Sequence, residues 1–214
     1  MSYTGDVTPG GPPAVRTLAG LTITKVSVGP MDNNAYLLRG GDTQVLIDAA
    51  NDARTLLDLI GPAGLTTVVT THRHGDHWQA LAEVAEATGA ASLAHADDAP
   101  AIPVVTATLR DGDPVQVGDQ TLEVIHLVGH TPGSIALLYQ DPGGSAHLWT
   151  GDSLFPGGPG RTTNPRDFTS LMDDLEAKVF GRLPDDTWFY PGHGNDSTLG
   201  AERPAIPEWR ARGW

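Results

Sequence analysis

The sequence predicts an α/β protein, a four-layer αβ/βα sandwich in which two mainly antiparallel sheets pack together and helices cover their outer faces. Three observations predict this architecture. Strand pairs joined by short polar turns recur along the chain, helical segments alternate with these pairs, and glycine and proline are frequent, at 26 and 17 of 214 residues. With 39% hydrophobic and 18% charged residues, the composition is that of a packed globular protein.

Three segments have the pattern of a β-hairpin, in which two apolar or β-branched runs flank a turn rich in Gly and Asp. The second of them turns at Gly118-Asp119, a favoured two-residue hairpin turn. The first turns at Gly40-Gly41-Asp42, and the third within 141–145. The three predicted hairpins span residues 33–49, 113–128 and 134–152.

Helices are predicted at 52–60, 78–88 and 167–181, with a final helical turn near 202–210. In the second of these, Trp78, Leu81, Ala82 and Ala85 share one face at helical spacing, and Gly89 follows as a stop signal.

The chain is expected to form one domain. Residues 1–16 are polar and rich in Gly and Pro and predict a flexible N-terminal arm, and residues 17–214 predict a single domain, since layered α/β domains often reach this length undivided. The first residues lack the basic-then-apolar pattern of a signal peptide. No segment approaches the roughly 20 apolar residues of a membrane helix. A cytoplasmic protein with no membrane attachment is therefore expected.

Charge and cysteine content exclude several functions. The formal net charge is −13, and an acidic surface repels phosphate backbones, so nucleic acid is not an expected partner. The chain has no cysteine, which excludes disulfides, thiolate metal ligands and cysteine nucleophiles together. The sequence carries no signal for an oligomeric state.

The segment "THRHGDH", residues 71–77, places three histidines and one aspartate on a loop between a predicted buried strand and a predicted helix. Alternate residues of an extended chain face the same side, so His72 and His74 can reach one metal ion. Asp76 and His77 can then turn toward a second position. Because burying several imidazoles and a carboxylate together is costly without a metal, the cluster predicts metal binding.

Three further candidate ligands occupy the same kind of position. His130, Asp152 and His193 each follow an apolar strand in a Gly-rich loop, within "GHTPGS", "TGDSLF" and "YPGHG". Zinc favours neutral imidazole with carboxylate. Seven ligands are too many for one tetrahedral ion and predict two divalent ions that share a bridging carboxylate. Zinc is the expected metal, with iron and manganese as alternatives.

The other three histidines are expected to have structural roles. His126 and His147 lie within predicted strands, and His95 lies in a predicted loop.

These motifs resemble the metallo-β-lactamase superfamily, and the match covers nearly the whole chain from about residue 20. "THRHGDH" matches its H-x-H-x-D-H motif, and the three later loops match its other metal loops. The complete set most resembles the glyoxalase II (hydroxyacylglutathione hydrolase) branch. The resemblance implies that one metal is held by His72, His74 and His130, the other by Asp76, His77 and His193, and that Asp152 bridges them.

The sequence differs in two respects from known enzymes of the superfamily that it resembles. Glyoxalase II has a longer C-terminal helical region whose basic residues hold the glutathione carboxylates, whereas the sequence here ends with "PEWRARGW". That thiol-recognition element is therefore expected to be missing, and glutathione is not implied as the thiol. The lack of cysteine excludes lactamases with a metal-binding Cys, and a bridging Asp152 argues against the other zinc lactamases.

The expected function is hydrolysis of a small-molecule thioester or ester through a metal-bound hydroxide. Asp76 is expected to be catalytic as well as a ligand, because it can orient that hydroxide and accept its proton. Asp48 is a candidate hydrogen-bond partner of a ligand histidine. Asn34, Tyr36 and Arg161 are candidates to line the substrate pocket.

Two alternatives are kept. The same superfamily contains mononuclear iron persulfide dioxygenases, and this chain has "GRT" after its Asp loop but lacks their Cys-containing "GCGRTDF". The other alternative is a non-catalytic metal-binding protein that kept the fold. All seven ligand positions are filled, whereas such proteins typically lose a ligand.

Overall fold

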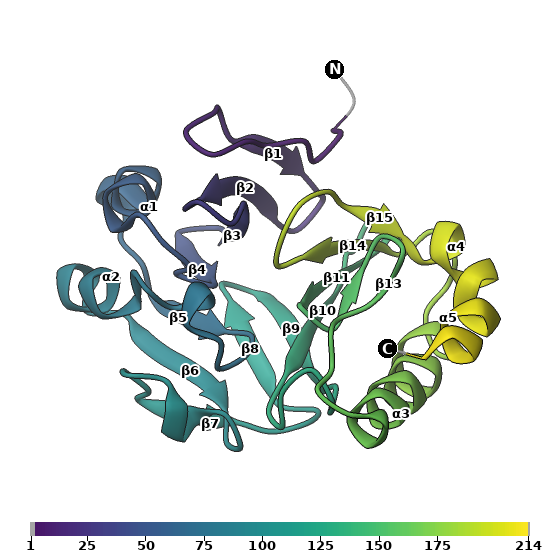
Figure 1. Cartoon of the computed structure of the whole chain (residues 1–214). Helices are drawn as coiled ribbons and strands as arrows, with labels where there is room; N and C mark the ends of the chain where they lie inside the picture. Colours follow the sequence, from purple (N-terminus) through teal and green to yellow (C-terminus); the bar gives the residue numbers. More distant parts are fainter. Residues whose placement is uncertain (1–2, 214) are drawn as a thin grey trace.

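A computed structural model describes residues 3–213 and has four layers (Figure 1). Helices α1 (Ala53–Ile60) and α2 (Leu81–Thr88) cover the outer face of one sheet. Helices α3 (Pro165–Asp174), α4 (Leu199–Glu202) and α5 (Ile206–Arg212) cover the outer face of the other. The predicted sandwich of two sheets with outer helices is confirmed.

The first sheet has seven strands in the order β1-β2-β3-β4-β5-β6-β7. The pairs from β1 to β4 are antiparallel, and the pairs from β4 to β7 are parallel. The sheet is therefore more mixed than predicted, because the chain returns from β4 and from β5 through helices, and such crossovers join parallel strands. The strands are β1 (Ala14–Thr17), β2 (Thr22–Val28), β3 (Asn33–Gly40), β4 (Thr43–Ile47), β5 (Thr67–Thr70), β6 (Ala91–His95) and β7 (Ala107–Leu109).

The second sheet has six strands in the order β15-β14-β11-β10-β9-β8, and only the β11–β14 pair is parallel. The three predicted hairpins are present as the antiparallel pairs β3–β4, β8–β9 and β10–β11. The strands of this sheet are β8 (Pro114–Val117), β9 (Gln120–His126), β10 (Ile135–Gln140), β11 (Ala146–Gly151), β14 (Trp188–Pro191) and β15 (Ser197–Thr198), and a separate pair is formed by β12 (Leu154–Phe155) and β13 (Gly158–Pro159).

The predicted helices are present with changed ends. Helix α2 begins at Leu81 rather than at residue 78, because the backbone N–H groups of Gln79 and Ala80 donate to the carbonyls of Ala50 and Ala49. These bonds fasten the start of the segment to the loop after β4. The predicted helix at 167–181 is α3 followed by a π-helical turn (Leu175–Phe180), and short 3₁₀ turns occur at Gly61–Ala63, Gly75–His77, Ala99–Ala101 and Arg203–Ala205.

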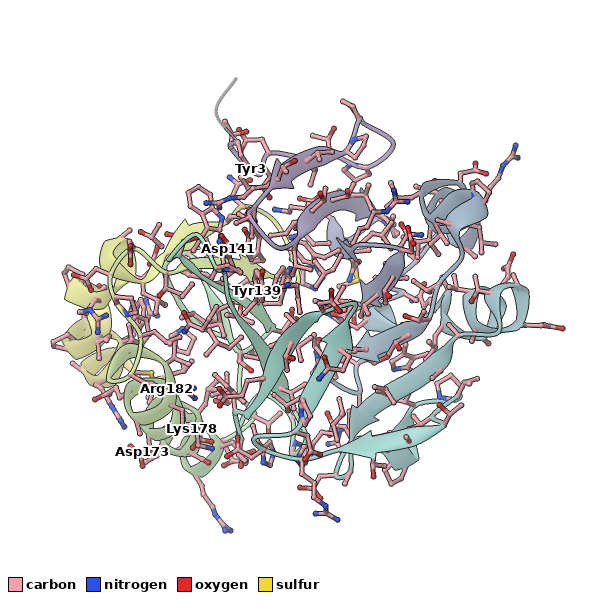
Figure 2. The ribbon with its side chains drawn as sticks, turned by 180° about the vertical axis from the view of Figure 1, so that it is seen from behind. Tyr3, Tyr139, Asp141, Asp173, Lys178 and Arg182 are labelled. Atoms are coloured by element: carbon pink, nitrogen blue, oxygen red, sulfur yellow. The ribbon has the colours of Figure 1, made fainter. Side chains whose placement is uncertain are left out.

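The N-terminal residues join the first sheet earlier than the predicted boundary at residue 17. Strand β1 pairs with β2 from Ala14 onward. Upstream of it, the Tyr3 ring lies 5.9 Å from the Trp188 ring, centre to centre, and its hydroxyl donates to Asp196. Figure 2 shows Tyr3 beside the first strands, above the labelled Asp141. The expected arm of residues 1–16 therefore includes one side chain that packs on the second sheet and the start of a strand.

The apolar side chains form three clusters, one for each junction between layers. One cluster packs α1 and α2 on the first sheet, one fills the space between the sheets, and one packs α3 and α5 on the second sheet. At one rim of the second sheet, the Asp141 carboxylate accepts from the backbone N–H groups of Ala19 and Gly20. The same carboxylate accepts from the hydroxyl of Tyr139, which lies beside it at the end of β10 (Figure 2). Asp141 thereby connects the β1–β2 turn to the end of β10.

No helix within residues 3–213 is long and apolar enough to cross a membrane.

Leu38 tests the layer between the sheets. Its side chain is fully buried there, so Leu38→Ala leaves a cavity and is expected to lower the free energy of unfolding by about 2–5 kcal/mol. Val15, on the edge strand β1, is 53% exposed, and Val15→Ala is expected to change it by less than about 0.5 kcal/mol. Denaturant titration measures both, and equal effects would contradict the layer assignment.

Candidate metal centre

The candidate ligands lie at one edge of the sandwich because the strands that precede them all end there. Strands β4 and β5 are parallel, as are β11 and β14, and β9 runs in the direction of β11 because each is antiparallel to β10. The backbone N–H of Ile135 donates to the Thr71 carbonyl across the two sheets. Loops that are far apart in the sequence are thereby brought to one place.

All seven predicted ligands lie within this edge, in two overlapping sets. The ligand atoms of each set are within 4.8 Å of one another: His72, His74 and His130 form the first, and Asp76, His77 and His193 the second. Asp152 lies between the sets. Its Oδ2 is 3.9 Å from His72 Nε2 and 3.7 Å from His130 Nε2, and its Oδ1 is 3.4 Å from His77 Nε2.

The ring nitrogens that face away from the centre are held by oxygen atoms. The Nδ1 atoms of His130 and His193 donate to the carbonyls of Arg161 and Met31, at 2.7 and 3.0 Å. The Nδ1 of His77 donates to the Asp48 carboxylate at 2.8 Å. With its proton on Nδ1, each of these rings directs the Nε2 lone pair inward, which is the arrangement that metal-binding histidines show.

The tautomer of His72 is also set by a hydrogen bond to its Nδ1. The hydroxyl of Thr71 donates to Asp48, at 2.8 Å, so its oxygen accepts from His72 Nδ1, at 3.1 Å. The Nε2 of His72 then carries a lone pair with no donor opposite it.

Several inward-facing atoms have no hydrogen-bond partner among the described residues. His72 Nε2, His130 Nε2 and Asp152 Oδ1 are buried and unpaired. His77 Nε2 and His193 Nε2 are only 3.2 Å apart, and with both protons on Nδ1 their lone pairs face each other. Buried unpaired acceptors are costly. A cation within each ligand set removes that cost, so the donor set fits a pair of divalent ions.

The pKa values of the centre reflect a competition between burial and the charges of neighbouring groups. Burial alone would raise the pKa of Asp152. His77 and His193 have the larger, opposite effect, and the pKa of Asp152 lies well below its usual range. Burial lowers the pKa of His77, but Asp48 and Asp152 raise it more strongly, to about 10. Burial and the neighbouring His77 hold the pKa of His72 well below its usual value. Without metal, a proton on His77 therefore balances the carboxylates, and bound cations would replace it.

Asp48 occupies the position predicted for a partner of a ligand histidine. It follows β4 with φ 58°, a left-handed backbone that turns its carboxylate toward the centre. Besides His77 Nδ1, this carboxylate accepts from the backbone N–H and the hydroxyl of Thr71. Asp48 is only 2% exposed, so it is well placed to fix the orientation of His77.

Asn33 is a functional candidate that the sequence analysis missed. Its side-chain amide donates to the Asp76 carboxylate at 2.9 Å and to the Asp76 carbonyl at 3.0 Å. The sequence predicts the adjacent Asn34 as a pocket residue and does not single out Asn33. Successive residues of a strand face opposite sides, and the paired asparagines "NN" carry no signal that tells which of the two faces the ligands.

Asn34 and Tyr36 do not line an open pocket, in contrast to the prediction. Both are buried between the sheets, at 0% and 2% exposure. The Asn34 amide donates to the carbonyls of Pro191 and Gly194, and the Tyr36 hydroxyl donates to the Pro191 carbonyl at 2.6 Å. Their role is to hold the loop that carries His193.

A buried ion pair supports the same loop. Lys25 Nζ lies 2.6 Å from Asp196 Oδ1, both side chains are fully buried, and Lys25 also donates to the Gly194 carbonyl. Glycine is required nearby, because a Cβ at Gly192 would lie 2.6 Å from His77 Cε1 and would overlap Asp152 Oδ1.

Asp98 links the two loops of the first ligand set and was also missed. One carboxylate oxygen accepts from the Arg73 backbone N–H and the Thr131 hydroxyl, and the other accepts from the Gly133 backbone N–H. "HADDAP" contains two adjacent aspartates, and sequence alone does not separate the buried Asp98 from the exposed Asp97.

The remaining histidines lie outside the centre. His147 is buried and hydrogen-bonds to Ser145 and Tyr190, and burial lowers its pKa to about 4. The rings of His95 and His126 stack with their centres 3.8 Å apart, and His126 Nε2 donates to the Pro132 carbonyl. With Asp97, these two histidines form a further group with metal-ligand spacing.

Comparison with known proteins identifies the family. The model of the metallo-beta-lactamase superfamily matches residues 28–193, which include all seven candidate ligands. The chain belongs to the metallo-beta-lactamase superfamily. Within this superfamily it is 37% identical over 168 residues to a hydroxyacylglutathione hydrolase of Fuscovulum blasticum. That match covers 76% of this chain and 62% of the relative, so the chain spans less than two thirds of the relative's length.

Two solved structures are similar to this chain over most of their own length. TTHA1623, solved in a di-iron-bound form, has a TM-score of 0.71 and 32% identity, covering 84% of this chain and 96% of that one. ETHE1 from Myxococcus xanthus has a TM-score of 0.76 and 28% identity, covering 86% and 83%. The predicted resemblance to the superfamily and to its hydroxyacylglutathione hydrolases is thereby confirmed.

Asp48→Asn tests the support of His77. In this variant, an amide N–H group can replace the carboxylate oxygen that His77 Nδ1 contacts. The amide would then donate a hydrogen bond to Nδ1, and the imidazole proton would move to Nε2, where it blocks metal binding. We expect the affinity of the centre for divalent metal to fall about 10–100-fold. Competition with a chromophoric chelator measures it. Asp58→Asn, at an exposed position of α1, is the matched control, and equal affinities in both variants would contradict the role of Asp48.

Proposed function

We propose that this protein is a dinuclear metal-dependent hydrolase that cleaves a small thioester or ester. The observation that carries the proposal is the pair of adjoining ligand sets with Asp152 between them. The similarity to hydroxyacylglutathione hydrolases supports an acyl-transfer reaction, and the di-iron form of TTHA1623 supports a pair of ions.

In this proposal, His72, His74 and His130 would hold the first ion, Asp76, His77 and His193 would hold the second, and Asp152 would be shared between them. Zinc is the proposed metal, with iron and manganese as alternatives. Divalent ions held there would supply Lewis acidity for an acyl oxygen and would lower the pKa of water at the centre toward neutrality. The buried hydrogen bonds to Nδ1 hold the imidazoles in place before the substrate arrives.

Asp76 is the proposed catalytic carboxylate. The Asn33 amide donates to its Oδ2, which lies 3.3 Å from His193 Nε2. Burial raises the pKa of Asp76, but His77 and the hydrogen bond from Asn33 lower it more, so the group is ionised at neutral pH. An ionised carboxylate at this position can accept a hydrogen bond from the attacking water and orient it toward the acyl carbon.

Two open pockets beside the ligand sets give room for the two parts of such a substrate. One has a volume of about 350 Å³ and is lined by residues that include His74 and His130. The other, about 290 Å³, is lined by the segment from Phe155 to Arg161, and the Phe155 ring lies 6.3 Å from the His193 ring. The position of Arg161 in the lining of this second pocket supports its proposed role as a substrate-pocket residue.

Asp152→Asn tests the shared carboxylate. Loss of its charge removes the group common to both ligand sets, so we expect the metal content to fall from two ions per chain to one or fewer. Turnover is expected to fall by more than about 100-fold, since outer hydrogen-bond partners of ligands alone contribute about 10–100-fold. Asp186→Asn, at an exposed position, should change neither. Full metal content in Asp152→Asn would exclude a bridging role.

Metal analysis of freshly purified protein, paired with a panel of acyl thioesters and esters, tests the function as a whole. Two ions per chain with hydrolysis of at least one thioester or ester is the expected result. One iron per chain with oxygen consumption would favour the persulfide dioxygenase alternative. The similarity to ETHE1 from Myxococcus xanthus is the comparison that fits this alternative. Metal binding without turnover of any compound in the panel would favour a non-catalytic protein.

A further inference from the structure

The pocket beside the first ligand set is lined by two arginines. It lies between the His72–His77 loop, the loop that carries His130, and the start of α3, and Arg73 and Arg166 both line it. We propose that this pocket binds a carboxylate of the substrate, so that the enzyme selects singly charged anionic thioesters or esters over neutral ones. This inference rests on the proposed function and names its substrate class.

Neither guanidinium group donates a hydrogen bond among the described residues, and the one ion pair there is a long one between Arg73 and Asp98. Arg166 is exposed and makes no ion pair among residues 3–213. Arg73 Nε is 3.9 Å from Asp98 Oδ1, beyond hydrogen-bond distance, and its side chain is 43% exposed. The Asp98 oxygens are already used by three other donors. Both guanidinium groups therefore have N–H donors available for a ligand.

The charge inside the pocket matches one carboxylate. Asp167 also lines the pocket, but its carboxylate accepts from the Asn164 amide at 2.7 Å and the Thr163 hydroxyl at 3.3 Å, at the start of α3. Among the charged residues that line the pocket, two arginines and one aspartate leave a net charge of +1, which suits a singly charged carboxylate better than a phosphate. Asp98 pairs with Arg73 at 3.9 Å but does not line the pocket. Guanidinium groups bind carboxylates through paired hydrogen bonds, which fixes orientation as well as charge.

The location of this positive charge is unusual for the molecule. The chain has a net charge of −13, so at long range the protein repels anions. Surface charges farther than about 8 Å are screened at physiological ionic strength, so the charges that line the pocket, the two arginines among them, act on a ligand there more strongly than the distant acidic surface does. A volume of about 350 Å³ is enough for a small acyl group or thiol. An anionic group placed there would leave the scissile bond beside His74 and His130.

The test compares thioesters that differ only in charge. One pair is a succinyl thioester of a neutral thiol and its terminal-amide counterpart. The other pair is an acetyl thioester of 3-mercaptopropionate and that of its amide. We expect kcat/KM to be at least about tenfold higher for the acid member of one pair, the range of a hydrogen bond to a charged group. The pair that shows the preference identifies the acyl or the thiol part as the source of the carboxylate.

Arg166→Gln is expected to bring the acid-to-amide ratio of kcat/KM close to one, and Arg73→Gln to lower it, with metal content measured in both. Arg54→Gln, on α1 at an exposed position, is the matched control and should keep the ratio of the unchanged protein. A ratio of one or less in both pairs of the unchanged protein, or an unaltered preference in both arginine variants, would overturn the proposal.

Binding without turnover separates this inference from the proposed function. The ligands for this measurement keep the carboxylate of each acid substrate, but nitrogen replaces the thioester sulfur so that they resist hydrolysis. Calorimetry with metal-loaded protein should show that they bind, and that binding weakens in Arg166→Gln. If no substrate is hydrolysed but this binding is present, the hydrolase proposal fails and the carboxylate pocket stands. If neutral and acidic thioesters are hydrolysed equally, the hydrolase proposal stands and the carboxylate pocket is wrong.

Discussion

Lone pairs and carboxylates crowd one edge of the sandwich, and their mutual repulsion is the constraint on which the rest of the centre depends. Imidazole Nε2 atoms from His77 and His193 lie 3.2 Å apart, and the largely buried Asp152 adds negative charge between the two ligand sets. Such an arrangement is strongly unfavourable unless cations compensate it. In their absence a proton on His77 does so in part, as its raised pKa shows.

This arrangement persists because atoms outside the ligand sets hold it. Carbonyl groups of Met31 and Arg161 and the Asp48 carboxylate fix three imidazoles from three separate segments. Asn34 and Tyr36 hold the His193 loop from the first sheet. The centre thus joins the two sheets at their common edge, so metal binding and the stability of the sandwich are expected to be linked, as they are in other metal-binding folds.

The candidate ligands could be selected from the sequence because each has a local signature. Histidine or aspartate directly after an apolar strand, in a loop rich in glycine, identifies a strand end, and strand ends of parallel strands share an edge. The three hairpins were predictable for a similar reason, since the turn residues lie between two apolar runs. What these signals share is that they depend on residues close together in the sequence.

Features that depend on tertiary packing could not be read in this way. Whether Asn33 or Asn34 faces the candidate ligands depends on the register of β3 against β2 and β4, and a shift by one residue reverses every side chain. The start of α2 depends on two hydrogen bonds to the loop after β4. The parallel half of the first sheet results from crossovers through α1 and α2. The pocket arginines were missed because Arg73 and Arg166 are 93 positions apart and meet only through the fold.

The most direct test of a two-ion centre is anomalous X-ray diffraction from crystals of the protein loaded with zinc or iron. The account predicts two peaks about 3.5–4 Å apart, one among His72, His74 and His130 and one among Asp76, His77 and His193, with Asp152 between them. A single peak in one ligand set would contradict the paired centre. Imidazoles that point away from an empty edge, in crystals grown with excess metal, would contradict the whole account.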